Sequence, residues 1–237
     1  MNQTGQKVAI ITGGSQGIGA SLVAAYRRQG WGVVATARTM KPTEDSDVLT
    51  VDGDIAKPAT ADRIVSGALE RFGRIDTLVN NAGVYISKPF TDYTAADYAA
   101  VVGVNLTGFF WLTQRAVDEM ASRYGGHIVN IMATVAESAN SGTPAVLAAL
   151  TNGALAAATR SLATEYACYG VRVNAVSPGI IQTPVYSPDC DDLGDRLRPL
   201  RRPGRAGGVV DGVLFLESLS HITGEILHID GGQIAGH

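Results

Sequence analysis

The residues whose types and spacing point to chemistry begin with a glycine-rich stretch, Thr12-Gly13-Gly14-Ser15-Gln16-Gly17-Ile18-Gly19. An apolar run, Val8 to Ile11, leads into it, and a helical pattern, Ala20 to Gln29, leads out. Glycines allow a tight turn and a close approach of the backbone to a ligand, and the free N–H groups at a helix start attract a phosphate. The stretch therefore predicts a dinucleotide-binding turn. Because its spacing is Thr-Gly-x-x-x-Gly-x-Gly, an ordinary turn stays open as the alternative.

A second signal follows the predicted strand from Gly32 to Ala37. In a dinucleotide-binding fold the end of this strand meets the adenosine ribose, where an acid would bind the 2′-hydroxyl and an arginine would accommodate a 2′-phosphate. The sequence has no acid at this point and supplies Arg38. It therefore favours NADP(H) over NAD(H), with a solvated surface arginine as the alternative.

Short β-branched runs alternate with longer helical patterns along the whole chain. Such alternation is typical of crossover units and of a parallel sheet covered by helices on both faces. The chain has 237 residues, 46% of them hydrophobic, and shows no linker or repeat, so one α/β domain spanning residues 1–237 is predicted. Further strands are expected near residues 48–51, 77–79 and 126–131, and helices near 58–72, 98–123 and 146–166.

Composition excludes several classes of partner. The net charge of −3 offers no electrostatic footprint for DNA or RNA. The N-terminus lacks the apolar core of a signal peptide, and no apolar run is expected to be long enough to span a bilayer, so no membrane partner and a cytoplasmic location are predicted. Cys168 and Cys190 share no metal-ligand spacing; we interpret them as a packing and a loop cysteine, and expect no metal.

Five motifs occur in order along the chain: Thr12-Gly13 with Gly17-Ile18-Gly19, Asp54-Ile55, Asn80-Asn81-Ala82-Gly83, Asn105 within Val104 to Gly108, and Pro178-Gly179 after Arg172 to Ser177. Together they resemble the short-chain dehydrogenase/reductase family over nearly the full chain, through Ile229-Asp230-Gly231-Gly232. The resemblance implies a Rossmann-type, doubly wound sheet of about seven parallel strands in three α/β/α layers. It also implies hydride transfer between a nicotinamide cofactor and a small carbonyl compound.

The resemblance further implies a set of cofactor contacts. Asp54 would lie beside the adenine, Asn81 and Gly83 near the cofactor, and Pro178, Gly179 and Thr183 around the nicotinamide and phosphate end. Plainer roles stay open: Asp54 as a helix cap, Asn81 as a tie between strands, and Pro178-Gly179 as a turn. The full predicted cofactor set is Thr12, Gly13, Ser15, Gln16, Gly17, Ile18, Gly19, Arg38, Asp54, Ile55, Asn81, Ala82, Gly83, Asn152, Pro178, Gly179 and Thr183.

The family places a proton-donating tyrosine four residues before a lysine on one helix face, with a serine on the preceding strand end and an asparagine nearby. In this sequence the serine position falls on Ala133, with Thr134 next to it. The downstream half of the helix, from Leu155 to Glu165, fixes a register that puts Ala148 at the tyrosine position and Asn152 at the lysine position.

A shift of one residue would give Leu147 and Thr151, so neither register holds a phenol or an ammonium. Asn105 alone is retained, and a shifted strand end would let the Thr134 hydroxyl replace that of serine. Asn152 can hydrogen-bond the ribose but carries no charge. The candidate catalytic residues are therefore Asn105, Thr134 and Asn152.

Four residues qualify as replacement proton donors because their loops should open on the substrate side of the sheet: Tyr85, Glu137, Ser138 and Tyr186. For the two tyrosines the alternative is a pocket wall that contacts substrate. The charged segment 184–208 is interpreted as a solvated lid, with contact between its arginines and an anionic substrate as the alternative.

The helices near 98–123 and 146–166 carry apolar residues on more than one face, as a helix that also meets a second subunit does. A homodimer or homotetramer is therefore predicted, with deeper burial within one chain as the alternative. Two functions stay open. The first is an NADP(H)-dependent oxidoreductase with an unorthodox proton donor, and the second is a catalytically degenerate relative that binds a cofactor or ligand without redox chemistry.

Overall fold

A computed structural model describes residues 5–139, 143–183 and 199–235 of the chain. The main sheet has the order β3-β2-β1-β4-β5-β6-β9, and every neighbouring pair is parallel. Its strands are β1 (Val8–Thr12), β2 (Gly32–Ala37), β3 (Val48–Asp52), β4 (Thr77–Asn80), β5 (Gly126–Ile131), β6 (Val171–Pro178) and β9 (Ile226–Ile229). A separate pair joins β7 (Ile181–Gln182) and β8 (Gly204–Arg205). The predicted doubly wound, seven-stranded parallel sheet is confirmed.

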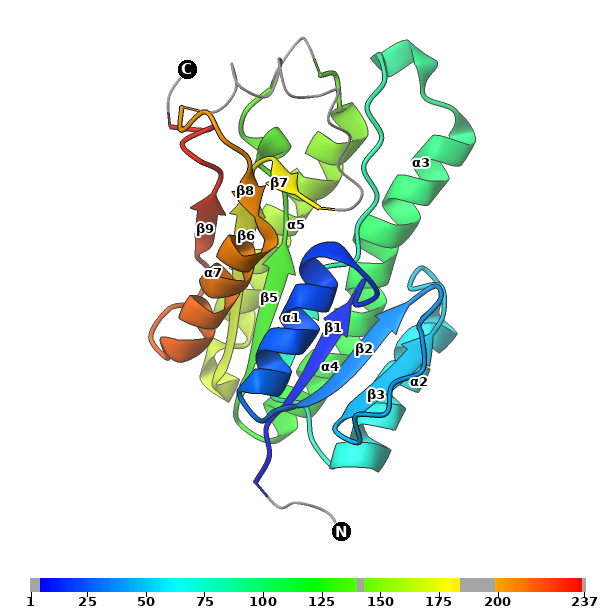
Figure 1. Cartoon of the computed structure of the whole chain (residues 1–237), viewed down its shortest axis with the longest axis vertical. Helices are drawn as coiled ribbons and strands as arrows, with labels where there is room; N and C mark the ends of the chain where they lie inside the picture. Colours follow the sequence, from blue (N-terminus) through cyan, green and yellow to red (C-terminus); the bar gives the residue numbers. More distant parts are fainter. Residues whose placement is uncertain (1–4, 140–142, 184–198, 236–237) are drawn as a thin grey trace.

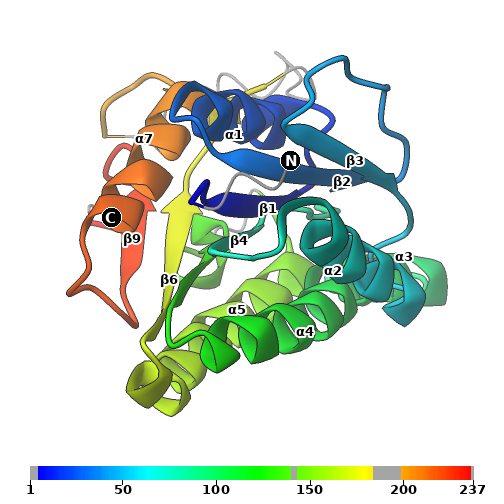
Figure 2. The same cartoon turned by 90° about the horizontal axis from the view of Figure 1, so that it is seen from below.

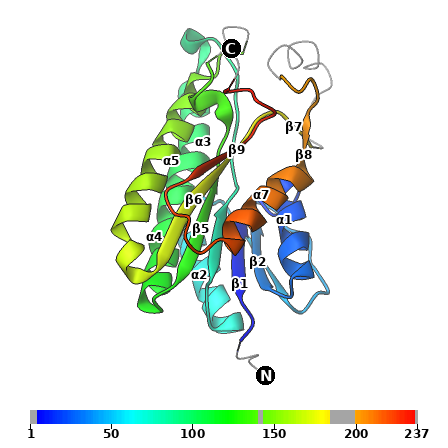
Figure 3. The ribbon, with the colours of Figure 1, turned by 90° about the vertical axis from the view of Figure 1, so that its left-hand side faces the viewer.

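Helices cover both faces of this sheet. The longer ones are α1 (Gly17–Arg28), α2 (Pro58–Phe72), α3 (Ala95–Val102), α4 (Phe109–Ser122), α5 (Val146–Glu165) and α7 (Ala206–Ser218). Figure 2 shows α1 and α7 on one face and α2, α4 and α5 on the other, and Figure 3 shows the same three layers from the side. The predicted three-layer α/β/α arrangement is therefore present.

Two apolar clusters hold the layers together. One packs the buried side chains of α2 and α4, among them Ile64 and Leu112, against β1, β4 and β5. The other packs α1 and α7, with Leu22 and Leu216, against the opposite face. Because β-strand side chains point alternately to the two faces, consecutive residues such as Ala9 and Ile10 enter different clusters.

The strands end at one common edge of the sheet, which is the upper edge in Figure 1. Register pairs Ile11 with Val79, Asn80 with Asn130, and Ile131 with Val176, so the residues that follow β1, β4, β5 and β6 emerge close together. The chain order of the sheet reverses between β1 and β4. In open sheets of this kind, ligands bind at that reversal, beyond the carboxyl ends of the strands.

The helix predicted near residues 98–123 differs from the observed one. It begins at Ala95, where Thr94 and Asp97 form a capping box, and a π-helical turn, η2 (Gly103–Gly108), interrupts it before α4. A capping box satisfies free N–H groups at a helix start, which fixes the earlier start point.

The joined run Ala95–Ser122 has 28 residues and is, by length and composition alone, apolar enough to cross a membrane. The expectation that no segment has the required length is therefore wrong, although one such helix is weak evidence for a membrane. Only 22% of its most apolar window is buried. Leu112, Ala116 and Met120 on its inner side nevertheless pack in the core.

Candidate active site at the carboxyl edge of the sheet

The glycine loop between β1 and α1 is built from close backbone contacts. Gly13 and Gly17 have φ of 67° and 58°, in the left-handed region that favours glycine. A Cβ on Gly19 would lie 2.1 Å from the Gly13 carbonyl oxygen, and one on Gly13 would lie 2.9 Å from the Asn81 amide nitrogen. The loop therefore requires glycine at these positions, and its backbone is left open to a ligand.

The first turn of α1 has backbone N–H groups that could bind an anion. The N-cap residue Gln16 makes no side-chain capping bond in this structure, and the first turn of α1 contains no acid. Free N–H groups and the helix dipole together favour a phosphate at such an end. Ser15 and Gln16 are exposed there, and Ile18 is half-buried. The described residues thus fit a dinucleotide pyrophosphate at this loop.

Asn81 and Thr12 join the ends of β4 and β1. The Thr12 hydroxyl accepts hydrogen bonds from the backbone N–H groups of Asn81 and Ala82, at 2.9 and 2.8 Å. The Asn81 amide donates to the Thr12 carbonyl at 2.8 Å. The plainer role of Asn81, a tie between strands, is therefore real, and a cofactor contact would come in addition to it. Gly83 is exposed on the loop just beyond.

Three other predicted cofactor residues lie at the same edge. Arg38 is exposed directly after β2, and Asp54 is exposed after β3. The Asp54 carboxylate accepts from the Ala56 N–H at 3.1 Å, whereas the N-cap residue of α2 is Lys57. Asp54 is thus not the helix cap that was the plainer alternative. Ile55 is buried beneath it and packs in the core.

Residues after β6 lie at the same edge of the sheet. A Cβ on Gly179 would lie 2.9 Å from Asp230 Cα, so glycine is needed where β6 and β9 diverge. Thr183 reaches back to the glycine loop, because a Cβ on Gly17 would lie 3.6 Å from its methyl group. Just before Pro178, the hydroxyl of Ser177 is buried and has no hydrogen-bond partner among the described residues, and the same holds for the hydroxyl of Thr36 on β2. Buried polar atoms normally have partners, so both hydroxyls suit an edge that receives a polar ligand.

Asn105 lies in the π-helical turn η2, and its side chain forms hydrogen bonds with the loop after β4 and with α5. Its Oδ1 accepts from the Val84 N–H at 2.8 Å, and its Nδ2 donates to the Val84 carbonyl at 3.0 Å and to the Thr151 hydroxyl at 3.2 Å. Thr151 is buried on α5. π-helical turns are frequent at functional sites, and this one fixes Asn105 between the loop after β4 and α5.

Asn152 connects α5 to the end of β5. Its Oδ1 accepts from the Ala133 N–H at 2.7 Å, and its Nδ2 donates to the Ala148 carbonyl at 2.8 Å. Ala148 and Asn152 therefore share the helix face that meets Ala133, whereas Thr151, from the shifted register, faces Asn105. Thr134 is buried at the start of η3 (Thr134–Ala136). The structure thus brings Ala133, Ala148 and Asn152 together.

Three of the four candidate replacement proton donors lie in the described residues. Glu137 follows η3, and its Oε1 lies 3.0 Å from Nε2 of His228 on β9. Sequence reasoning missed His228, although it occupies the strand just before the Asp230-Gly231-Gly232 turn. Ser138 is half-buried on the same loop, and Tyr85 is 55% exposed. Tyr186 and most of the predicted lid lie outside the described residues.

Metal binding finds no support in the described ranges. Within residues 5–139, 143–183 and 199–235, no three His, Cys, Asp or Glu side chains come close enough to hold an ion. Cys168 is exposed in η4 (Ala167–Tyr169), so its interpretation as a packing cysteine is wrong, and Cys190 lies outside the described residues.

Comparison with known proteins identifies the scaffold. The profile of the family described as short chain dehydrogenase matches residues 7–193. The chain belongs to the short-chain dehydrogenase/reductase family. It is 36% identical over 240 residues to a granaticin polyketide synthase putative ketoacyl reductase 2 of Streptomyces violaceoruber, covering 95% of each chain. It is 31% identical over 256 residues to a levodione reductase of Leifsonia aquatica, covering 98% of this chain and 95% of that one.

Solved structures agree with this assignment. The chain superimposes on ElxO with NADP bound with a TM-score of 0.89 at 28% identity, covering 98% of this short-chain dehydrogenase/reductase and 100% of ElxO. It also superimposes on gox2181 with a TM-score of 0.92 at 30% identity, covering 98% and 96% of the two chains. The relatives are oxidoreductases, and at least one structural neighbour binds NADP.

Proposed function

We propose that the protein is an NADP(H)-dependent oxidoreductase that reduces a small carbonyl compound, with a proton donor other than the family's tyrosine. The observation that carries the proposal is the glycine loop, in which Gly13, Gly17 and Gly19 leave the backbone open at an uncapped helix end. The NADP-bound ElxO structure and the relatives named as reductases support it.

The catalytic positions are the unusual part of the proposal. We assign Ala133, Ala148 and Asn152 to the places of the family's serine, tyrosine and lysine, because the Asn152 amide bridges the other two residues. A methyl group cannot donate a proton, and an amide carries no positive charge. Asn105 keeps its role beside α5, where it would anchor a proton-relay water.

Hydride transfer stays possible with these residues. When bound, the nicotinamide would supply the hydride, and the glycine loop and the amino end of α1 would hold the cofactor by its pyrophosphate. Positioning alone can contribute about 7–11 kcal/mol, whereas losing a placed general acid lowers the rate by about 10²–10⁴. The proton would come from water, from the substrate or from the pair formed by Glu137, on the loop after Ala133, and His228 on β9. Slow turnover is the expected result.

The second candidate function is a cofactor-binding or ligand-binding protein without redox chemistry. Ala148 and Asn152 favour it, because no phenol or ammonium stands at either position. A chain that had lost the cofactor would have no need of the glycine loop, Asn105 and Pro178-Gly179 together, so the redox function is preferred.

Cofactor choice can be tested at Arg38. NADPH is expected to bind more tightly than NADH, and Arg38→Ala should weaken NADPH binding about tenfold while NADH binding stays unchanged, because only NADPH carries the 2′-phosphate. Nicotinamide fluorescence measures both affinities, and ketones and aldehydes are then added to detect turnover. No binding of either nucleotide would exclude both candidate functions, and binding without turnover would favour the second.

The glycine loop can be tested at Gly19. Gly19→Ala is expected to weaken NADPH binding by tenfold or more, about 1.4 kcal/mol, because the new Cβ would collide with the Gly13 carbonyl oxygen. Gly153→Ala is the matched control, since no atom of the described part of the chain lies within 4 Å of a Cβ at this position on α5. Unchanged NADPH affinity in a folded Gly19→Ala protein would contradict the proposed cradle.

We also propose that the protein acts as a homodimer or homotetramer in the cytoplasm. Its small-molecule substrate would enter at the carboxyl edge. Exposed apolar side chains on α3, α4 and α5 support a subunit contact, namely Tyr98, Phe110, Val146 and Leu150.

A further inference from the structure

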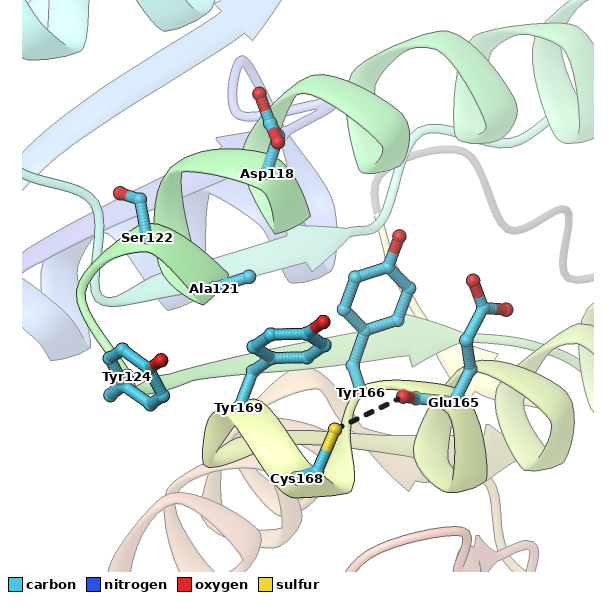
Figure 4. Close-up of a pocket in the computed structure, with 8 residues that line it drawn as sticks. All are labelled: Asp118, Ala121, Ser122, Tyr124, Glu165, Tyr166, Cys168 and Tyr169. Atoms are coloured by element: carbon cyan, nitrogen blue, oxygen red, sulfur yellow. Dashed lines mark hydrogen bonds between the residues drawn. The ribbon is translucent and has the colours of Figure 1, made fainter.

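A hollow of about 620 Å³ lies where α4 and α5 end, and Tyr124, Tyr166 and Tyr169 are among the residues that line it (Figure 4). It lies on the helices that carry the proposed subunit contact, so a second copy of the chain would cover it. It also adjoins the first residues of β5 and β6, at the end of the strands opposite to the proposed active site. Side chains that can serve the proposed reaction lie instead at the carboxyl edge of the sheet, on β6 and β9.

His228 on β9 and Ser177 on β6 lie side by side at this edge, because the register of the two strands pairs their Cα atoms. Side chains along a strand alternate between the two faces of the sheet. Ala175 and Ile226, two residues earlier on these strands, pack with Leu155 of α5. His228 and Ser177 therefore also point to the face of the sheet that α5 covers.

Ser177 lies between this imidazole and the proposed catalytic positions. Because Ile131 pairs with Val176, Ser177 is level with the residue before Ala133 at the end of β5. Asn152 of α5 bonds to the Ala133 N–H at 2.7 Å, so α5 meets the sheet at the same height. In the strand order β5-β6-β9, with a spacing of about 4.8 Å, the hydroxyl is one strand away from the end of β5 and the imidazole is two.

Glu137 holds the imidazole from the loop after β5. Its Oε1 lies 3.0 Å from His228 Nε2, whereas Nδ1 has no hydrogen-bond partner in the described part of the chain. A carboxylate bound to one ring nitrogen fixes the orientation of the ring and leaves the other nitrogen for proton transfer. The side chains of His228 and Glu137 are 28% and 36% exposed, so solvent can return a proton to the pair.

The Ser177 hydroxyl is fully buried and has no partner among the described residues. Buried hydroxyl groups normally have one. A hydroxyl both donates and accepts, so it can take a proton from an imidazolium on one side and give its own proton on the other. Proton delivery is the function that Ala133, Ala148 and Asn152 do not supply.

We propose that His228 is the proton donor for carbonyl reduction, with the Ser177 hydroxyl as the relay and Glu137 as the residue that positions the imidazole. This inference rests on the proposed oxidoreductase function. The carbonyl carbon accepts a hydride from the bound nicotinamide. The carbonyl oxygen takes a proton from the Ser177 hydroxyl, directly or through one water, while Ser177 takes the Nδ1 proton of the imidazolium.

The bonds and charges of this step balance. A C–H bond and an O–H bond form, and the nicotinamide C–H bond and the Nδ1–H bond break. NADPH is oxidised to NADP⁺, the ketone is reduced to the alcohol, and the Ser177 hydroxyl is unchanged. Solvent then protonates His228 again.

His228→Gln tests the donor in the full chain. Glutamine keeps an amide N–H for Glu137 but has no proton to transfer, so ketone reduction should slow about tenfold or more while NADPH affinity is retained. His221→Gln, at an exposed position between α7 and β9, is the matched control and should have no effect. If the natural chain reduces a ketone and His228→Gln is as fast, this inference alone fails. If NADPH binds and no ketone is reduced, the proposed function fails as well.

Ser177→Ala distinguishes a relay from a structural hydroxyl. Removing a buried hydroxyl that has no partner should leave the free energy of unfolding unchanged or raise it, whereas ketone reduction should slow about tenfold. Urea denaturation and initial rates measure the two effects. A less stable protein with an unchanged rate would contradict the relay.

Glu137→Ala is expected to lower kcat about fivefold with little change in KM, because the imidazole is no longer oriented. Glu137→Gln keeps an oxygen acceptor for the Nε2–H group and should recover part of the rate. Equal loss in the two variants would overturn the positioning role of Glu137.

A binding measurement needs no turnover. In the presence of NADP⁺, which has no hydride to give, cyclohexanone is expected to shift the ring signals of His228 in heteronuclear NMR spectra and to leave those of His221 in place. The His228→Gln protein assigns the signals. Unshifted His228 signals at saturating cyclohexanone would overturn the proposal.

Discussion

A variant with Ala133→Ser, Ala148→Tyr and Asn152→Lys is expected to reduce carbonyl compounds about 10²–10⁴ times faster than the natural chain, because it regains a positioned general acid. The three residues already adjoin one another through the Asn152 amide, so the new side chains would share one site. The lysine ammonium would lower the pKa of the phenol and hold the nicotinamide ribose. Initial rates with NADPH and a panel of ketones measure the effect.

The matched control replaces tyrosine with phenylalanine, as Ala133→Ser, Ala148→Phe and Asn152→Lys. The two triple variants differ by one oxygen atom, so any gain confined to the tyrosine variant comes from the proton. Ala148 is only 2% exposed, and both rings must find the same room, which thermal melts would compare. If both variants fold, bind NADPH and reduce ketones at equal rates, the helix register behind these substitutions is wrong.

The sequence was sufficient for most of the fold. The helix predicted from 58 to 72 matches α2 because Pro58 at its first position and Gly73, with a φ of 77°, mark its ends. The strand predicted from Gly32 to Ala37 matches β2, since a buried β-branched run has few other conformations. The start of α3 was missed because the capping box of Thr94 and Asp97 precedes the apolar residues that define the helix.

The site was harder to predict than the fold. Motif spacing found the glycine loop and Asn105, but the hydrogen bond between Asn105 and Thr151 joins residues 46 apart and depends on how η2 and α5 pack. The Glu137–His228 pair likewise joins the loop after β5 to β9, at a separation of 91 residues. Local patterns predict which side chains leave a strand or helix, whereas tertiary packing decides which of them meet.

A buried polar cluster at the amino end of the sheet is a further contact of this kind. The Glu217 carboxylate of α7 accepts hydrogen bonds from three elements, namely from Tyr26 on α1 at 3.2 Å, Thr77 on β4 at 2.9 Å and His127 Nδ1 on β5 at 3.0 Å. His127 Nε2 in turn accepts from the Asn174 amide of β6 at 3.1 Å. The interpretation of His127 as structural agrees with this position, and the cluster joins α1 and α7 to the middle of the sheet.

Glu217→Ala is expected to lower the free energy of unfolding by about 3–5 kcal/mol, because it leaves three buried donors without their acceptor. Glu217→Gln keeps one oxygen acceptor and should lose about 1–3 kcal/mol. Asp211→Ala, at an exposed position on the same helix, is the control for helix propensity and should stay within about 0.5 kcal/mol of the natural chain. Urea denaturation measures all three, and equal values for Glu217→Ala and Asp211→Ala would contradict the role of the cluster.

The same cluster makes stability depend on pH with a definite sign. Burial lowers the pKa of His127, and it outweighs the opposing hydrogen bond and charge of Glu217. Burial alone would raise the pKa of Glu217, but hydrogen bonds from His127 and Thr77 and nearby positive charge outweigh it, so this pKa is lowered as well. The unfolded chain therefore binds more protons than the folded one in both titration ranges.

Stability from His127 is present above its unfolded pKa of about 6.5 and is lost as the pH falls towards its folded pKa, with a slope of up to about 1.4 kcal/mol per pH unit. Stability from Glu217 is lost in turn below about pH 4.5. His127→Asn keeps an amide donor near Nδ1 but cannot titrate, so its free energy of unfolding should change less than that of the natural chain between about pH 6.5 and pH 5. Parallel curves for the two proteins would mean that His127 binds protons equally in the folded and unfolded states, which would contradict the lowered pKa.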